Sequence, residues 1–289
     1  MKLKVWIEAM RLRTLPVSVA GVIMGTGYAV YYNSVDYGAA ALCLLFAVLA
    51  QIASNFANEY YDFRDGLDKP GRVGPRRGVT EGDITPRGML IATFGTLVAA
   101  CVVGLSLLMF GPWWLIPVGA AIGLGVLAYS TGPYPLSRHG LGEVAVLMFF
   151  GVIPVNLTYF LQSGMFCWPV LMGSVSAGLM GANVLLVNNY RDEPADKMVG
   201  KNTLAVLWGR KAASALYLLN GYLAVAFMWQ QWLSLGSAAM TVPAVYLLVH
   251  TALWLRIIKT DGTALNPMLG ITAMLMLCYA VSFAFIAWR

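Results

Sequence analysis

The chain has 289 residues, of which 59% are hydrophobic and 11% charged, and its mean hydropathy is +0.71. Soluble globular chains carry about 25% charged residues, so this composition excludes an ordinary soluble domain and predicts a protein that crosses a membrane repeatedly. The formal net charge of +6 is spread over loops and helix ends without a recognisable nucleic-acid-binding module, and we therefore expect no nucleic-acid partner.

Apolar runs long enough to span a bilayer, which takes roughly 20 helical residues, follow one another along almost the whole chain. They predict an all-α integral membrane protein with nine transmembrane helices in a single domain over residues 1–289. The first run is too long for the apolar core of a signal peptide and lacks an obvious cleavage site, so we expect it to be retained. The nine helices are expected at about 14–32, 38–60, 88–110, 113–131, 141–161, 168–190, 212–233, 237–257 and 267–288.

The basic residues predict the orientation of these helices. Lysine and arginine occupy the N-terminus and the loops after the second, fourth, sixth and eighth predicted helices. By the positive-inside rule, all of these segments are cytoplasmic. Four cysteines, at positions 43, 101, 167 and 278, are scattered singly through apolar segments without metal-ligand spacing, so we expect them to be core residues.

One short pattern, Asn-x-Tyr-x-Asp, occurs twice, at 58–62 and at 188–192, each time at the end of a long apolar run. Asp65 follows the first copy by three positions and Asp196 follows the second by four, so on helices each set lines one face. Crowded carboxylates repel each other unless a cation lies between them, and Mg²⁺ prefers such oxygen ligands, often bridging to phosphate. The sequence therefore predicts Mg²⁺ binding at both copies, on the cytoplasmic side.

The loop after the first copy, residues 66–78, is rich in glycine and proline and carries Arg72, Arg76 and Arg77. A turn-rich loop made basic by the positive-inside rule would explain these residues without any function. Beside acids that hold Mg²⁺, however, guanidinium groups would form a diphosphate site, because metal and cations together neutralise the oxygens. Lys201, which follows the second copy, would complete this arrangement.

Structural ion pairing is the alternative explanation for these charges. Arg191 would neutralise Asp192 or Glu193, and Arg64 would do the same for Asp62 or Asp65. Ionisable groups at a membrane edge cost several kcal/mol unless they are paired or hydrated, so they are functional candidates by default. Two matched clusters in one chain favour a functional site over two coincidental ion pairs.

The first cluster with Asp62 and Asp68, the loop at 72–77 and the stretch from Asn188 through Asp196 to Leu204 together carry a family resemblance. They resemble the UbiA-type intramembrane aromatic prenyltransferases. Within that superfamily the chain is most similar to the 1,4-dihydroxy-2-naphthoate polyprenyltransferases of menaquinone synthesis, through the stretches at 13–16, 129–136, 140–143 and 266–267. The matches run from the first predicted helix to the ninth.

The resemblance implies helices around a central cavity and Mg²⁺-dependent transfer of a polyprenyl group from polyprenyl diphosphate to 1,4-dihydroxy-2-naphthoate. The ring carboxylate would be lost, giving demethylmenaquinol, and the reaction would take place in the lipid bilayer of a bacterial inner membrane. The implied metal ligands are Asn58, Asp62, Asp65, Asp68, Asn188, Asp192 and Asp196. The implied substrate-binding residues are Arg72, Arg76, Arg77, Arg138, Arg191, Lys201 and Tyr134, and the implied catalytic residues are Asp62, Asp192, Lys201 and Tyr129.

One position departs from the family pattern. The first motif usually begins Asn-Asp, whereas this chain has Asn58-Glu59, and Glu59 lies about 100° away from the face of Asn58 on a helix, which favours a supporting role. Whether Asp65 or Asp68 completes the first set stays open. We expect His139 to be a loop histidine, with assistance in proton transfer as the alternative, and His250 to be structural.

Two other functions compete with this assignment. A secondary transporter also shows repeated motifs in two chain halves and acids at helix ends. Both copies here have the same orientation, however, and the helix centres are almost free of charge, whereas a path across the membrane would place ionisable groups deeper. The nearer alternative is a prenyltransferase for another acceptor, such as 4-hydroxybenzoate, a haem or a chlorin.

Overall fold

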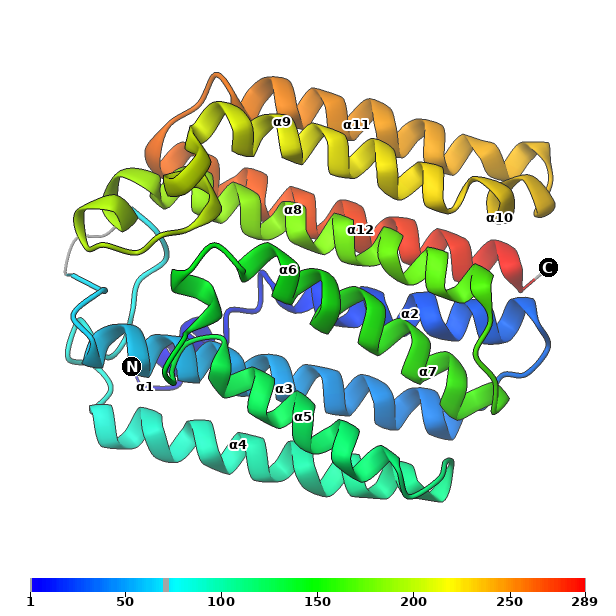
Figure 1. The fold of residues 1–289 in the computed structure, drawn as a ribbon, viewed down its shortest axis with the longest axis horizontal. Coiled ribbons are helices and arrows are strands. Elements are labelled where there is room, and N and C mark those ends of the chain that lie inside the picture. The colour runs from blue at the N-terminus through cyan, green and yellow to red at the C-terminus, as the bar shows by residue number, and fades with distance from the viewer. Residues whose placement is uncertain (1, 70–72, 289) are drawn as a thin grey trace.

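The structure is a computed structural model that describes residues 2–69 and 73–288, and its regular elements are helices packed side by side with their axes roughly parallel (Figure 1). The α-helices are α1 (Lys2–Met10), α2 (Leu15–Tyr31), α3 (Tyr37–Arg64), α4 (Pro86–Ser106), α5 (Leu115–Ala128), α6 (Gly142–Val146), α7 (Ile153–Ser163), α8 (Trp168–Met198), α9 (Leu204–Phe227), α10 (Trp229–Ser234), α11 (Thr241–Ile257) and α12 (Asn266–Ala287). Short 3₁₀ turns are η1 (Leu107–Met109), η2 (Leu136–Arg138), η4 (Ser237–Met240) and η5 (Gly262–Leu265), and η3 (Leu147–Val152) is a π-helix.

Six helices in the described part of the chain are long and apolar enough to cross a membrane, and a seventh span arises if α1 and α2, bent by 53°, are taken together. The protein is therefore a multi-pass membrane protein. Two of the nine expected helices fall short of this criterion. Helix α5 has 14 residues, and α9 carries Arg210, Lys211 and Asn220, which lower its apolar content.

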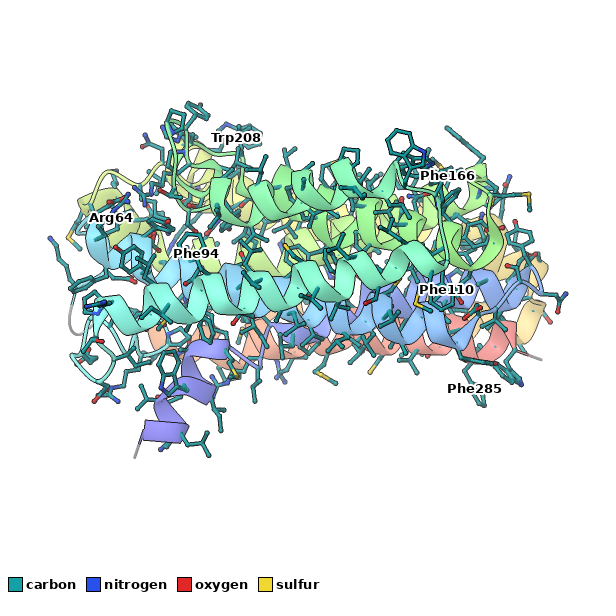
Figure 2. The ribbon with its side chains drawn as sticks, turned by 90° about the horizontal axis from the view of Figure 1, so that it is seen from below. Arg64, Phe94, Phe110, Phe166, Trp208 and Phe285 are labelled. Atoms are coloured by element: carbon teal, nitrogen blue, oxygen red, sulfur yellow. The ribbon has the colours of Figure 1, made fainter. Side chains whose placement is uncertain are left out.

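Large apolar side chains cover much of the outer surface of the bundle. Phe94, Phe166, Trp208 and Phe285 all lie exposed on its periphery (Figure 2). A soluble protein rarely exposes so many large apolar groups, whereas hydrocarbon solvates them well.

The main core of the bundle lies along α2, α8, α9 and α12, where glycines allow the helices to approach closely. A Cβ atom on Gly151 would lie 2.3 Å from the Cα atom of Gly178, so the segment that joins α6 to α7 lies directly against α8.

The span from Gly142 to Ser163 is interrupted by the π-helix η3. Pro154 follows this turn and has no N–H to donate to the carbonyl of Phe150 four residues earlier, which explains why the helix widens at this point. The wider turn places Phe149 and Phe150 next to the internal cavity described below.

The polar loops gather at one end of the bundle, at the left of Figure 1, together with α1. Contacts join them there. His139 in the loop after α5 pairs with Asn202 in the loop after α8, and Arg210 at the start of α9 pairs with Asp261 in the loop after α11. Both Asn-x-Tyr-x-Asp copies lie at this end, at the C-terminal turns of α3 and within the last turns of α8.

Candidate active site

The first acid cluster lies on the last turns of α3, where the helix continues past its apolar stretch as far as Arg64. Asp62 is only 1% exposed, and Arg77 from the following loop is buried beside it. Arg77 donates a hydrogen bond to the side-chain oxygen of Asn58 at 2.9 Å, and its nitrogens lie 3.0 Å from Asp68 and 3.7 Å from Asp62. One guanidinium therefore holds the loop and the helix together through several oxygens, which its fixed fork of donors permits.

Glu59, the residue that departs from the family pattern, has a different environment. Its carboxylate accepts a hydrogen bond from the backbone N–H of Val79 at 3.1 Å and lies 4.0 Å from Arg77. Glu59 thus fixes the loop 73–85 against α3, as expected for a side chain that lies off the Asn58 face.

The second cluster, on α8, carries its own cation. Arg191 is 2% exposed and donates bidentate hydrogen bonds to Asp192 at 2.7 and 2.8 Å. It also donates to the side-chain oxygens of Asn188 and Asn266, both at 2.8 Å. The structural pairing of Arg191 with Asp192, considered above as an alternative, is present, and Arg191 also ties α8 to the start of α12.

Lys201 joins the two clusters. Its ammonium nitrogen lies 3.8 Å from a carboxylate oxygen of Asp62 on α3 and 4.0 Å from one of Asp196 on α8. Arg138, from η2, adds a third cation near Asp62, with its guanidinium 3.8 Å away. Residues far apart in the chain therefore form one continuous group of acids and cations at the polar end of the bundle.

Three other predicted residues lie at the edge of this group or outside it. Asp65 pairs with Arg64 at 2.7 Å and with Arg138 at 2.6 Å, and these hydrogen bonds, that of Arg64 first, lower the pKa of Asp65 below its ordinary value. Arg76 lines the cavity and forms an ion pair with Asp83. Tyr134 is exposed and stacks on His139, so it is not among the residues that line the cavity. Arg72 lies outside the described residues.

The two histidines are engaged in packing contacts. The Nδ1 atom of His139 lies 2.8 Å from the carbonyl oxygen of Pro135 in its own loop. His250 is buried on α11, where its ring stacks between Tyr217 and Tyr246 and its Nε2 atom lies 3.3 Å from the carbonyl of Leu218.

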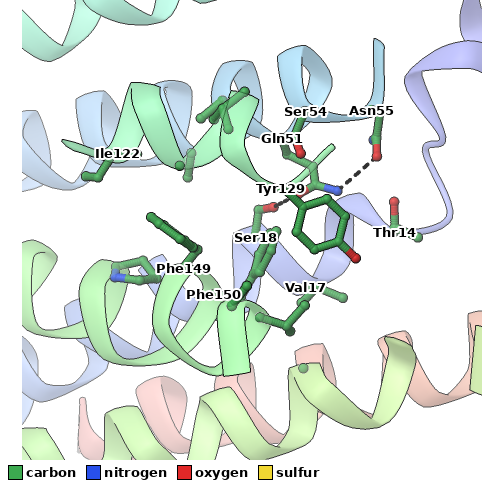
Figure 3. A pocket seen from close by; sticks show the side chains of 18 of the residues that line it. Thr14, Val17, Ser18, Gln51, Ser54, Asn55, Ile122, Tyr129, Phe149 and Phe150 are labelled. Carbon is green, nitrogen blue, oxygen red and sulfur yellow. Dashed lines mark hydrogen bonds between the residues drawn. The ribbon is translucent and has the colours of Figure 1, made fainter. Parts of the chain in front are cut away.

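A cavity of about 800 Å³ opens beside the acid and cation group and continues between the helices. Asn58, Arg77, Asn188, Arg191 and Lys201 line its polar end. Figure 3 shows the zone next to it, where Tyr129 lies among Val17, Ser18, Phe149 and Phe150. Beyond this zone the lining is mostly apolar, from side chains that include Val22, Phe46, Leu105, Leu108, Leu115, Ile122 and Leu161. The cavity can therefore hold a molecule with an anionic head and a long apolar tail.

The contacts that the carboxylate oxygens already make indicate whether the acids could also bind a metal ion. In residues 2–69 and 73–288 no three His, Cys, Asp or Glu side chains are close enough to share one ion. Arginine and lysine side chains neutralise the acids. The buried Oδ1 atom of Asp62, however, accepts no hydrogen bond from any described residue. A buried carboxylate oxygen in that state is costly, and it fits a hard cation that brings its own oxygen-rich ligand.

Several residues that the structure brings into the site were not expected from the sequence. Arg11, which has a φ of +54°, donates to the side-chain oxygen of Asn58 at 2.7 Å and lines the cavity. In the sequence the positive-inside rule accounts for its charge by topology alone, although its place just before the first long helix indicates the polar end. Glu143 with Asn189, and Gln51 between Ser18 and Asn55, form buried polar contacts at the cavity wall.

Comparison with known proteins decides the family. Residues 18–276 match the model of the UbiA prenyltransferase family. The chain belongs to this family. The resemblance inferred from the motifs is thus confirmed, and this UbiA family protein is a prenyltransferase, which excludes the transporter alternative.

Curated relatives of this UbiA family protein carry a more specific name. A 1,4-dihydroxy-2-naphthoate octaprenyltransferase of Mycobacterium leprae is 36% identical, over 96% of this chain and 94% of the relative. Its namesake in Escherichia coli is also 36% identical, over 91% of this chain and 88% of the relative, and that of Haemophilus influenzae is 32% identical, over 98% and 95%.

Solved structures show the same fold at low sequence identity. A UbiA homologue from Archaeoglobus fulgidus, bound to GPP and Mg²⁺, has a TM-score of 0.70 at 14% identity and covers 97% of this chain and 99% of that chain. A homologue from Aeropyrum pernix has a TM-score of 0.69 at 15% identity, with 93% and 96% covered. The expectation of a UbiA-type helical fold is therefore confirmed.

Proposed function

We propose that this protein transfers a polyprenyl group from polyprenyl diphosphate to 1,4-dihydroxy-2-naphthoate, with loss of the ring carboxylate, to give demethylmenaquinol. The names of the curated relatives support this acceptor. The observation that carries the proposal is Lys201, which contacts acids of both clusters at the polar end of a long apolar cavity. That arrangement suits a diphosphate head and an isoprenoid tail.

Mg²⁺ would be held by oxygens of the two clusters, namely Asn58, Asp62, Asp68, Asn188, Asp192 and Asp196, with Asp65 nearer the surface. The ion would supply charge neutralisation for the diphosphate oxygens. The Mg²⁺-bound A. fulgidus homologue supports this choice of metal, with a match to this chain in fold.

The residues of the chain would act around that diphosphate. Arg77 and Lys201 line the cavity and would donate to its oxygens, and Arg76 would approach from the loop. These fixed cations would stabilise the negative charge that develops as the allylic carbon–oxygen bond breaks. The apolar walls would exclude water from the allylic cation, and the ring of Tyr129 would offer it an electron-rich face. Arg138 or Arg191 would orient the acceptor carboxylate.

We also propose the membrane arrangement expected from the sequence. A single domain would cross the bacterial cytoplasmic membrane nine times, with the N-terminus and the acid clusters on the cytoplasmic side. The gathering of polar loops at one end of the bundle supports this arrangement, and the positive-inside rule assigns that end to the cytoplasm.

The test is an assay of the purified protein in detergent with Mg²⁺, a polyprenyl diphosphate and 1,4-dihydroxy-2-naphthoate. We expect release of diphosphate and carbon dioxide and formation of a prenylated naphthoquinol, and loss of turnover when a chelator removes the metal. The assay runs in parallel with 4-hydroxybenzoate. Prenylation of 4-hydroxybenzoate in preference to the naphthoate would keep the reaction class and overturn the acceptor.

A further inference from the structure

Glu143 is a buried carboxyl group at the cavity wall that the proposed reaction has not yet used. It lies in the first turn of α6, is 7% exposed and lines the cavity. One carboxylate oxygen, Oε1, accepts a hydrogen bond of 2.8 Å from the side-chain amide of Asn189, which is itself buried on α8 and lines the same cavity. Asn189 therefore fixes the direction in which the second oxygen points.

The second oxygen, Oε2, is buried and has no hydrogen-bond partner among residues 2–69 and 73–288. Leaving such an oxygen without a hydrogen bond is destabilising, and more so when the group is charged. No ion pair with an arginine or lysine is formed by Glu143 in that part of the chain, in contrast to Asp62 and Asp192. A ligand in the cavity is thus the natural partner of Oε2, and it must present a hydrogen-bond donor.

The surroundings of Glu143 indicate which part of a ligand that donor belongs to. A diphosphate is anionic and would be repelled by this carboxylate. Phe149 and Phe150 follow Glu143 on the same continuous segment and line the cavity with Tyr129, so a flat aromatic ring can pack there (Figure 3). An aromatic ring that carries a hydroxyl group meets both requirements.

The position of Tyr129 relates Glu143 to the polar end of the cavity, where the diphosphate would bind. A Cβ atom on Gly142, the residue before Glu143, would lie 3.7 Å from the hydroxyl oxygen of Tyr129, so that hydroxyl is close to the start of α6. Tyr129 also lines the same cavity as Arg77 and Lys201. A ring beside Glu143 would therefore stand near the acids and cations that hold the prenyl donor.

We propose that Glu143 is the general base that accepts the proton of the acceptor's ring hydroxyl; this inference rests on the proposed function. The O–H electron pair enters the ring, and the ring carbon that bears the carboxylate forms a bond to the allylic carbon. The allylic carbon–oxygen bond breaks, and diphosphate leaves with its electron pair. Loss of carbon dioxide then returns the electron pair of the broken carbon–carbon bond to the ring, and Glu143 gives the proton back to the ring oxygen.

A structural role is the competing explanation, because an acid in the first turn of a helix stabilises its N-terminus. The variant Glu143→Gln separates the two. Its amide oxygen can still accept from Asn189, so the shape and the contact to α8 are kept, but the second position becomes a donor that cannot take a proton. We expect kcat/KM for 1,4-dihydroxy-2-naphthoate to fall about 10²- to 10⁴-fold, with an unchanged melting temperature and unchanged Mg²⁺-dependent binding of a non-reactive prenyl diphosphate analogue.

An acceptor analogue with a more acidic ring hydroxyl supplies the second measurement. Because such a hydroxyl needs less help from a base, the deficit of Glu143→Gln should be smaller with it than with the ordinary acceptor. Glu81→Gln is the matched control, since Glu81 lies exposed in the loop before α4, and it should retain wild-type turnover.

Near-normal kcat/KM in Glu143→Gln would overturn the inference, as would an equal deficit with both acceptors or a fall in melting temperature that accounts for the lost activity. These outcomes leave the proposed function standing if the wild-type protein prenylates the naphthoate. A wild-type protein that prenylates neither the naphthoate nor 4-hydroxybenzoate would overturn the proposed function, and this inference with it.

Discussion

Single residues at the polar end act as shared partners rather than as members of isolated pairs. Arg77 contacts Asn58, Asp62 and Asp68, and Lys201 contacts Asp62 and Asp196. Removing one partner of a buried charged group leaves the other unpaired, which costs more than the pair itself contributes. Each charge in this group therefore matters both for stability and for the reaction, and substitutions that keep the shape are needed to separate the two.

The acids are tested by Asp62→Asn and Asp192→Asn. Each change keeps the size of the side chain and removes the negative charge that would hold Mg²⁺ against the diphosphate, so we expect diphosphate release to be abolished while the protein still elutes as a folded species. Asp261→Asn is the control, because Asp261 is exposed and pairs with Arg210 away from the cavity. Retained turnover in either active-site variant would contradict a site shared by the two clusters.

Arg77→Lys tests the need for a forked donor. Lysine keeps the charge, but its single ammonium cannot reach Asn58 and Asp68 in the way the guanidinium does. We expect a loss of about 1–3 kcal/mol in the free energy of unfolding and a higher KM for the prenyl diphosphate, measured by thermal unfolding and by initial rates. Wild-type values for both would show that only the charge of Arg77 matters.

For single residues, the sequence predicted which side chains of a motif share a helix face, but it did not predict contacts between residues far apart in the chain. The sequence predicted that Asp62 and Asp192 belong to a site. In each motif the aspartate lies four residues after an asparagine, and residues four apart share a helix face. The contacts of Arg11 with Asn58 and of Glu143 with Asn189 join positions 47 and 46 apart, and no local pattern encodes them. Tyr134 shows the converse, since its place in a matching stretch did not bring it to the cavity.

At the scale of the elements, the main surprise is the length of α8. The sequence predicted its end near residue 190, but the helix continues to Met198 through Pro194. Pro194 has no N–H for the carbonyl of Tyr190 four residues earlier. The side chain of Arg210 donates a 3.1 Å hydrogen bond to that carbonyl instead and stacks over the Tyr190 ring at 4.8 Å. A side chain of α9 thereby extends the helix that carries Asp192 and Asp196.

A double-mutant cycle tests whether the hydrogen bond from Arg210 to the Tyr190 carbonyl replaces the backbone hydrogen bond that Pro194 cannot make. Arg210→Ala leaves the Tyr190 carbonyl without its donor, and we expect a loss of about 1–3 kcal/mol in the free energy of unfolding. Pro194→Ala restores a backbone N–H at the right position, so the double variant should lose less than Arg210→Ala alone. Additive losses in chemical unfolding would mean that Arg210 acts through its ion pairs with Glu193 and Asp261 rather than through the carbonyl.

The whole molecule has one charged end and a long apolar girdle, as the positions of the apolar runs and of the lysines and arginines in the sequence predicted. The order and approximate limits of the long helices follow from apolar runs, because a bilayer demands a length that a sequence can display. The 53° bend between α1 and α2 and the π-helix before Pro154 do not follow in the same way, since a run of apolar residues shows the length of a span but not its bends or local widening.

Orientation in the membrane is tested with single cysteines at the two ends, in a background without the four native ones. Glu81→Cys lies at the polar end and Met165→Cys at the opposite end, and both positions are exposed. In intact cells a membrane-impermeant maleimide should label Met165→Cys at once and Glu81→Cys only after the membrane is opened. The reverse pattern would place the acid clusters outside the cell and overturn the proposed topology.

The distribution of cations between the two clusters bears on how the chain enters its membrane during synthesis. Asp62 and Asp68 have Arg77 within the same hairpin, and Asp192 has Arg191 next to it, so each half of the molecule neutralises its own buried acids. Asp62 and Asp68 therefore have a cationic partner before α8 has been translated. Lys201 follows α8 in the chain, so its contacts with Asp62 and Asp196 can form only after both acid clusters have been synthesised.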